Sequence, residues 1–104
     1  MTQELSPQGL LILVIAPNLE ELFIDLLLED SAIVGFTSSH VSGHGATSAK
    51  LSLMEQVTGR QQRIQLMVYG AMSDLQNLVN HVKAKFSGAG VRYILLPVAD
   101  SQMI

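Results

Sequence analysis

The chain has 104 residues, the length of one small domain, and it carries a formal net charge of −3 with only 14% charged residues. Its six Lys and Arg residues form no run, which excludes the basic stripe of a nucleic-acid-binding protein, and the absence of Cys excludes disulfides, zinc–thiolate sites and redox thiols. Because hydrophobic residues make up 48% of the chain, we expect another subunit to cover part of its apolar surface.

The N-terminal residues 1–8 include Glu4 and lack a basic segment, so they are not predicted to be a signal peptide. The longest apolar run, residues 10–16, is far shorter than the roughly 20 residues of a membrane-spanning helix. We therefore expect a single domain over residues 1–104 and a cytoplasmic location.

The apolar run at residues 10–16 is rich in branched side chains and too short for a helix, so it predicts a central strand that is buried on both faces.

Asn18 and Glu21 then form an N-x-x-E capping box, which predicts a helix with Asn18 as its N-cap. Apolar residues continue at helical spacing to Leu27, and Asp30 closes this first helix.

Residues 32–41 are rich in β-branched and aromatic side chains and predict a second strand. Glycines follow at Gly43 and Gly45, and residues 42–62 are interpreted as a long loop or an extended hairpin. Loops of this length in compact domains are usually functional or mobile. We therefore expect this segment to have a role of its own.

Residues 63–70 alternate between two faces, which predicts a third strand with Ile64, Leu66 and Val68 on its apolar side. The opposite side carries Gln65, Met67 and Tyr69.

A second amphipathic helix is predicted after this strand. Ser73 and Gln76 form its capping box, and Gly88 is its expected C-cap. Residues 91–98 predict the last strand, and Pro97 favours an edge position for it.

The two halves of the chain repeat the order strand, helix, strand. This order predicts an α+β, ferredoxin-like βαββαβ sandwich, with the first and third strands in the middle of an antiparallel sheet. Both helices then cover one sheet face. Since the first strand is apolar on both faces, a second copy of the chain is the simplest cover for the open face.

No catalytic set can be assembled from the sequence, which has no G-x-S-x-G elbow, Walker loop or H-E-x-x-H motif. The carboxylates of the first helix are interpreted as a solvated surface. His40 and His44 lie four residues apart and are candidate ligands for a divalent metal, together with Glu55, although exposed loop histidines fit the same pattern.

Two glycine pairs are candidate backbone sites for an anion. Gly43 and Gly45 follow the second strand, while Gly88 and Gly90 lie between the second helix and the last strand. Glycine permits positive φ and lets backbone N–H groups approach a ligand closely. Ordinary turns use the same residues.

The order of residues in 35–45, GFTSSHVSGHG, fits the pattern G-x-T-x-x-x-V-x-G-x-G. This pattern resembles the segment that leads into the regulatory T-loop of PII signal-transduction proteins, the nitrogen regulatory superfamily. Residues 63–68 are similar to the third PII strand, and residues 88–90 to the end of the PII B-loop. The chain is most similar to short, uncharacterised bacterial PII-like proteins, some of which resemble companions of heavy-metal efflux systems.

The resemblance implies a homotrimer whose sheets face its interior, with small effectors, typically adenine nucleotides, in clefts between subunits. It implies that Thr37, Gly43 and Gly45 line one side of the cleft, and that Gly88 and Gly90 line the other. PII proteins place a Lys directly after the B-loop glycines, where this chain has Val91 followed by Arg92. Arg92 is therefore a further candidate effector-binding residue. The C-terminal arginines of PII proteins have no counterpart before Ile104. We therefore expect adenine-nucleotide binding to be weakened, since each lost charge-assisted bond costs about 1.5–3 kcal/mol.

The sequence thus favours a non-enzymatic, trimeric PII-like sensor that presents residues 42–62 to a transporter or regulatory protein. The alternative is a CutA-like metal-tolerance trimer with His40 and His44 as ligands. A third hypothesis, a small cofactor-free monooxygenase, rests on fold analogy alone.

Overall fold

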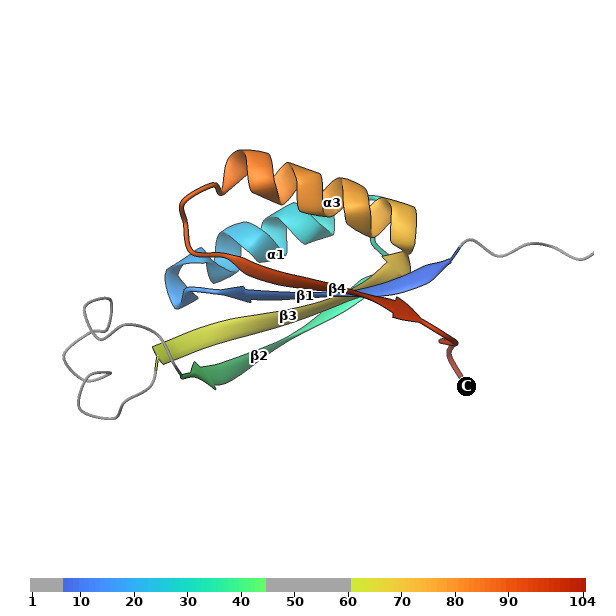
Figure 1. Cartoon of the computed structure of the whole chain (residues 1–104), viewed down its shortest axis with the longest axis horizontal. Coiled ribbons are helices and arrows are strands. Elements are labelled where there is room, and N and C mark those ends of the chain that lie inside the picture. The colour runs from blue at the N-terminus through green and yellow to red at the C-terminus, as the bar shows by residue number, and fades with distance from the viewer. Residues whose placement is uncertain (1–6, 45–60) are drawn as a thin grey trace, which may run out of the picture.

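Four strands and two helices make up the part of the chain that the computed structural model describes, residues 7–44 and 61–104 (Figure 1). In chain order they are β1 (Gln8–Ile15), α1 (Glu20–Glu29), β2 (Gly35–Gly43), β3 (Gln61–Ala71), α3 (Met72–Lys85) and β4 (Arg92–Val98), with a 3₁₀ turn, η1 (Pro17–Leu19), ahead of α1. The predicted ferredoxin-like order is confirmed.

The strands form one antiparallel sheet in the order β2-β3-β1-β4. The prediction that the first and third strands are central is therefore confirmed. β4 pairs only with β1 and forms an edge, where the missing N–H of Pro97 is tolerated.

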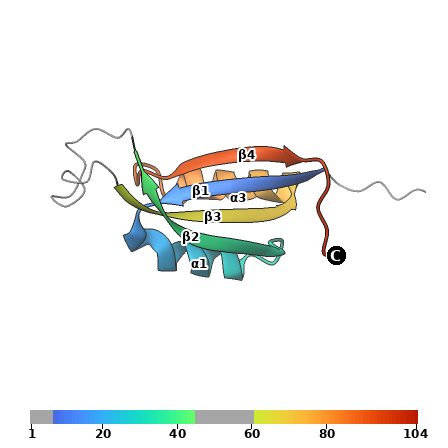
Figure 2. The same ribbon diagram turned by 90° about the horizontal axis from the view of Figure 1, so that it is seen from below.

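Both helices pack on the same face of this sheet (Figures 1 and 2). The face that they cover carries alternate residues of β1, because successive side chains of a strand point to opposite sides. The core consists of fully or almost fully buried residues from both layers: Leu11, Leu13, Ile15, Phe23, Leu27, Ile64, Leu66, Val68, Leu75, Leu78, Val79 and Val82.

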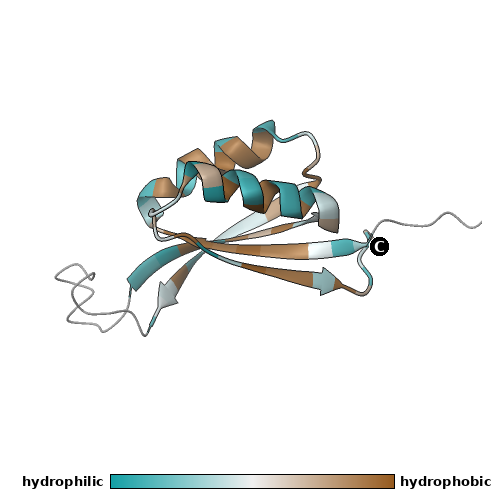
Figure 3. Ribbon diagram, turned by 45° about the horizontal axis from the view of Figure 1, so that its top comes forward, coloured by the Kyte–Doolittle hydropathy of each residue, from teal (hydrophilic) through white to brown (hydrophobic). Residues whose placement is uncertain are grey.

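The other face of the sheet, here called the open face, is also apolar. Its central residues on β1, Leu10, Ile12 and Val14, are only half-buried within the single chain. Register places the exposed side chains of Ile94 and Tyr69 on the same side. In Figure 3 the hydrophobic colour runs along the strands as well as the helices. The prediction that the first strand is apolar on both sides is confirmed.

Both predicted capping boxes are wrong. Pro17 occupies the first position of η1, because its fixed φ suits a helix start. Asn18 therefore lies inside the turn, and Ala16 takes the extended N-cap conformation. The second helix starts directly from the end of β3, with Ala71 as N-cap and Ser73 already helical. No side chain caps η1, α1 or α3.

The second strand starts later than predicted, at Gly35 instead of residue 32. The cause is a turn around Asp30, whose side chain accepts a hydrogen bond from the Ala32 N–H at 3.0 Å and whose backbone carbonyl accepts one from the Ile33 N–H at 3.1 Å. At the other end β2 continues to Gly43, and β3 begins at Gln61. Of the predicted 42–62 loop, only residues 42–44 and 61–62 are therefore described, and all of them except His44 belong to strands.

Neither helix in the described ranges is long and apolar enough to cross a membrane.

Candidate functional site

A pocket of about 350 Å³ lies at the end of the open face where β2 ends and β4 begins; we call it the sheet-end pocket. It draws on all four strands and on the turn before β4. Its lining residues are Val14, Gly43, His44, Gln61, Arg63, Gly90 and Arg92.

Strand register brings these residues together from distant parts of the sequence. Gly43 pairs with Gln61, and two residues further along the ladder Val41 pairs with Arg63. On the other side of β1, Val14 pairs with Arg92. Since Leu13 points into the core, Val14 and its partner Arg92 point to the open face.

Two arginines give the sheet-end pocket a positive charge. The Arg63 guanidinium donates hydrogen bonds to the side-chain oxygen of Gln61 and, at 2.8 Å, to the backbone carbonyl of Gln62. Gln61 is itself buried, so it fixes the orientation of Arg63. Within residues 7–44 and 61–104, no carboxylate forms an ion pair with Arg63 or Arg92. Their charge is thus available to an anion.

Four of the residues predicted as site residues lie together in this pocket: Gly43, His44, Gly90 and Arg92. Thr37 does not line it, because it lies six residues back along β2, which is about 20 Å of extended strand. Gly88 lines a different cavity, described below. Gly45 lies outside the described residues.

The two candidate metal ligands do not converge within one chain. His40 pairs with Ile64, whose side chain is buried under the helices, so His40 points to the helix side of the sheet. His44 lies in the sheet-end pocket on the open face. In the described residues, no three His, Cys, Asp or Glu side chains gather closely enough to hold a metal ion. Glu55 lies outside those residues.

Sequence reasoning missed Arg63 and Gln61. The signal that could have found Arg63 is the alternation of the third strand, since Arg63 continues the face that carries Gln65 and Met67. Its proximity to Gly43 depends on the β2–β3 register, which no local pattern specifies.

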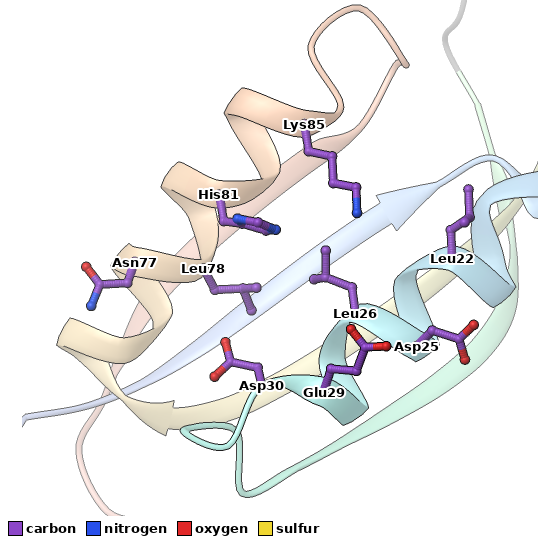
Figure 4. A pocket seen from close by; sticks show the side chains of 9 residues that line it. All are labelled: Leu22, Asp25, Leu26, Glu29, Asp30, Asn77, Leu78, His81 and Lys85. Atoms are coloured by element: carbon purple, nitrogen blue, oxygen red, sulfur yellow. The ribbon is translucent and has the colours of Figure 1, made fainter.

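Two further cavities lie on the helix side. One of about 260 Å³ lies between the end of α3 and β4, with Leu13, Val82, Phe86 and Tyr93 among its lining residues. The other is a groove of about 660 Å³ between α1 and α3, shown in Figure 4. Carboxylates of α1 border one side of the groove, while His81 and Lys85 of α3 border the other. None of its lining residues carries a hydroxyl or thiol group.

Three comparisons with known proteins place this fold. The model of a family described as "Protein of unknown function (DUF3240)" matches residues 5–104. A solved structure of a DUF3240 family protein from Shewanella baltica OS155 superposes with a TM-score of 0.77 at 15% identity, covering 96% of this chain and 99% of that one. No curated protein sequence matches the chain.

Two other solved structures have the same fold. The nitrogen regulatory PII-like protein CPII from Thiomonas intermedia K12, bound to ADP, AMP and bicarbonate, superposes with a TM-score of 0.70 at 17% identity, covering 97% of this chain and 100% of that one. The periplasmic divalent cation tolerance protein CutA from Archaeoglobus fulgidus gives a TM-score of 0.68 at 11% identity, with coverages of 91% and 87%. The chain therefore has the fold shared by PII-like and CutA proteins.

Proposed function

Since the chain belongs to the DUF3240 family and has the PII-like fold, we propose that it is a non-enzymatic regulatory protein that binds a small anionic effector in the sheet-end pocket. The effector state is transmitted to a partner, a transporter or a regulatory protein, through the segment that joins β2 to β3. In this proposal residues 42–62 are the signalling segment, and the protein acts in the cytoplasm.

The observation that carries this proposal is that one pocket is lined by two glycines and two arginines: Gly43, Gly90, Arg63 and Arg92. Gly43 and Gly90 have no side chains, so their backbone groups can approach a ligand closely. Arg63 and Arg92 supply two charges without carboxylate partners in the described part of the chain. Such a combination fits a phosphate or carboxylate group better than a metal ion or a neutral molecule.

The pocket's position also supports transmission of a signal. Gly43 and His44 are the last described residues before the segment that links the two strands, and Gln61 is the first one after it. If the segment has two conformations that place its ends differently, a ligand that contacts both ends binds the two with different affinity. That difference is the free energy by which binding shifts the equilibrium between the conformations.

We further propose that the working unit is a trimer whose open faces are turned inward. The exposed residues Tyr69, Ile94 and Leu96 lie on the open face together with the half-buried residues of β1. An apolar face of this extent on a soluble protein usually contacts another subunit. Thr37, which lies on the open face away from the pocket of its own chain, then becomes available to the cleft of a neighbouring copy.

The test of this proposal is isothermal titration with ADP, AMP, bicarbonate and inorganic phosphate. At least one anion is expected to bind, and Arg92→Gln should weaken that binding about tenfold or more, because a hydrogen bond to a charged group contributes about 1.5–3 kcal/mol. Arg63→Gln should act in the same direction.

Lys85→Gln is the matched control, since it removes a cation that borders the helix groove instead of the sheet-end pocket. If none of the four anions binds, or if Lys85→Gln weakens binding as much as Arg92→Gln, the sheet-end pocket is not the effector site.

A second candidate function is that of a CutA-like metal-binding protein, and the observation that favours it is the position of His44 in the sheet-end pocket. Because His40 points to the other side of the sheet, the remaining ligands would have to come from residues 45–60 or from another copy of the chain. Calorimetry with zinc, copper, nickel and cobalt tests this function. Metal binding that is unchanged in the His40→Ala/His44→Ala double variant would contradict it.

A further inference from the structure

The cavity between α3 and β4, here called the α3–β4 cavity, lies on the helix side of the sheet and is separate from the anion site proposed above. Its volume is about 260 Å³. The floor is the hydrophobic core itself, because Leu13, Val79 and Val82 are at least 94% buried and yet border the cavity.

One wall of the α3–β4 cavity is held in place by an aromatic pair. Phe86, at the end of α3, lies against Phe23 of α1 with a distance of 4.4 Å between the ring centroids. Phe86 also donates its backbone N–H to the carbonyl of Val82 at 2.8 Å. The wall is therefore part of the folded core, so the cavity is preformed and does not depend on a mobile side chain.

The mouth of the cavity is polar and carries a positive charge. The Lys83 ammonium group lies over the Tyr93 ring, 5.2 Å from its centroid, and both residues border the cavity. Tyr93 is 41% exposed, so the mouth opens to solvent. A cation–π contact of this kind holds the lysine head group at the opening without neutralising it.

The turn between α3 and β4 closes the remaining side. Gly88 and Gly90 both border the cavity, and a Cβ atom built on either would meet no atom within 4 Å. The backbone bond from the Ala89 N–H to the Phe86 carbonyl, 3.0 Å long, fixes the turn. No side chain at the two glycine positions fills the space beside the turn.

We propose that the α3–β4 cavity binds a small apolar molecule that carries a carboxylate group. The apolar part lies on Val79, Val82 and Phe86, and the carboxylate lies at the mouth beside Lys83. The C-terminal end of α3 opposes an anion, but the helix dipole amounts to about half a unit charge, whereas Lys83 supplies a full one. The volume falls just below the roughly 300–1,000 Å³ of sites for drug-sized ligands, which indicates a ligand of the size of octanoate.

The test is NMR titration of the intact protein with octanoate at concentrations below micelle formation, followed by the same titration with 1-octanol and octylammonium. Octanoate is expected to shift the methyl signals of Val79 and Val82 and to bind more tightly than octylammonium. Lys83→Met should weaken octanoate binding about tenfold or more, the loss expected for a hydrogen bond to a charged group. The affinity for 1-octanol should stay within a factor of about two, because the apolar floor is unchanged.

Lys85→Met is the comparison variant: it removes the same charge two residues further along α3, where Lys85 borders the groove between the helices and its ammonium group lies 5.9 Å from the centroid of the Phe86 ring. Octanoate affinity is expected to fall much less in this variant than in Lys83→Met, because Lys85 does not line the cavity. The proposal is overturned if octanoate leaves the Val79 and Val82 signals unshifted, if octylammonium binds as tightly as octanoate, or if the two lysine variants weaken octanoate binding equally. Arg92→Gln, which removes one of the two charges of the sheet-end pocket, should leave octanoate binding intact. These variants therefore distinguish a failure of the proposed carboxylate site in the α3–β4 cavity from a failure of the proposed anion site in the sheet-end pocket.

Discussion

Two residues of the turn between α3 and β4, Gly88 and Gly90, have φ angles of 81° and 76°. They are the only residues with positive φ in the described ranges. L-amino acids disfavour this conformation because Cβ approaches the following carbonyl oxygen. The turn that borders both proposed sites thus depends on glycine for its backbone shape.

Replacing either glycine by alanine should destabilise the protein although there is room for the added methyl group. We expect Gly88→Ala and Gly90→Ala each to lower the free energy of unfolding by about 1–2 kcal/mol, the cost of left-handed backbone in a residue with Cβ. Gly70→Ala is the control, because a Cβ there also meets no atom within 4 Å while φ is not positive. Urea unfolding measures all three. An equal loss in Gly70→Ala would contradict the backbone explanation.

The sequence predicted Gly43, Gly90 and Arg92 as effector contacts, and all three line the sheet-end pocket. Gly43 and Gly90 stood out only through their match to the family pattern, because ordinary turns use the same residues. Arg63 did not, since it lies 20 residues beyond Gly43 in the chain and approaches it only through the β2–β3 ladder. Thr37 was grouped with Gly43 by a linear pattern, although an extended strand separates them by about 20 Å.

Among the elements, the helix starts are the feature that the sequence predicted least well. The turn η1, which leads into α1, and the helix α3 each start after an alanine, Ala16 or Ala71, in the extended N-cap conformation without a side-chain acceptor. Local motifs placed Asn18 and Ser73 there instead. The position of an N-cap depends on where the pairing of the preceding strand ends. For α3 this position is fixed by the pairing of Ala71 with Gln8 and by the 2.7 Å hydrogen bond from the Met72 N–H to the Pro7 carbonyl.

The start of α3 gives a direct test of this difference. Ala71→Ser is expected to raise the free energy of unfolding by about 1 kcal/mol, because a serine oxygen can accept a backbone N–H of the first turn. Ser73→Ala is expected to change it by less than about 0.5 kcal/mol, as for an ordinary surface position. Thermal unfolding of both variants measures the effect. A loss of about 1 kcal/mol in Ser73→Ala would favour the capping box at Ser73 after all.

The strands, in contrast, were predicted well because their periodicity reflects burial directly. The three apolar residues of β3 that alternate in sequence are all fully buried, and the continuous apolar run of β1 does have two apolar faces. Strand ends were less certain: a turn around Asp30 removes residues 32–34 from β2, although Ile33 and Val34 are β-branched. Side-chain hydrogen bonding of this local kind competes with sheet pairing.

For the whole molecule, the contrast between the two sides of the sheet leads to a prediction about assembly. Ile94 on the open face and Leu28 on α1 are both exposed within the single chain, at 43% and 69%. Ile94→Asp is expected to convert a trimer of the 11.3 kDa chain into monomers at micromolar concentration, because an unpaired charge in an apolar interface costs several kcal/mol. Leu28→Asp, on the helix layer, should leave the trimer intact.

Light scattering measures the mass of each variant, and circular dichroism verifies that the monomeric variant is folded. A monomeric parent protein, or an Ile94→Asp variant that stays trimeric, would show that the open face is not the trimer interface.

Pro97 on β4 has a further consequence for how copies of the chain can associate. The free side of an edge strand offers N–H and C=O groups to any other strand, and unlimited addition of this kind produces fibres. Pro97 lacks the N–H that such a neighbour would need, although it still pairs with Gly9 on the inner side. Growth along this edge is thereby interrupted near the end of β4, so the chain can expose an edge strand without templating continuous sheet growth.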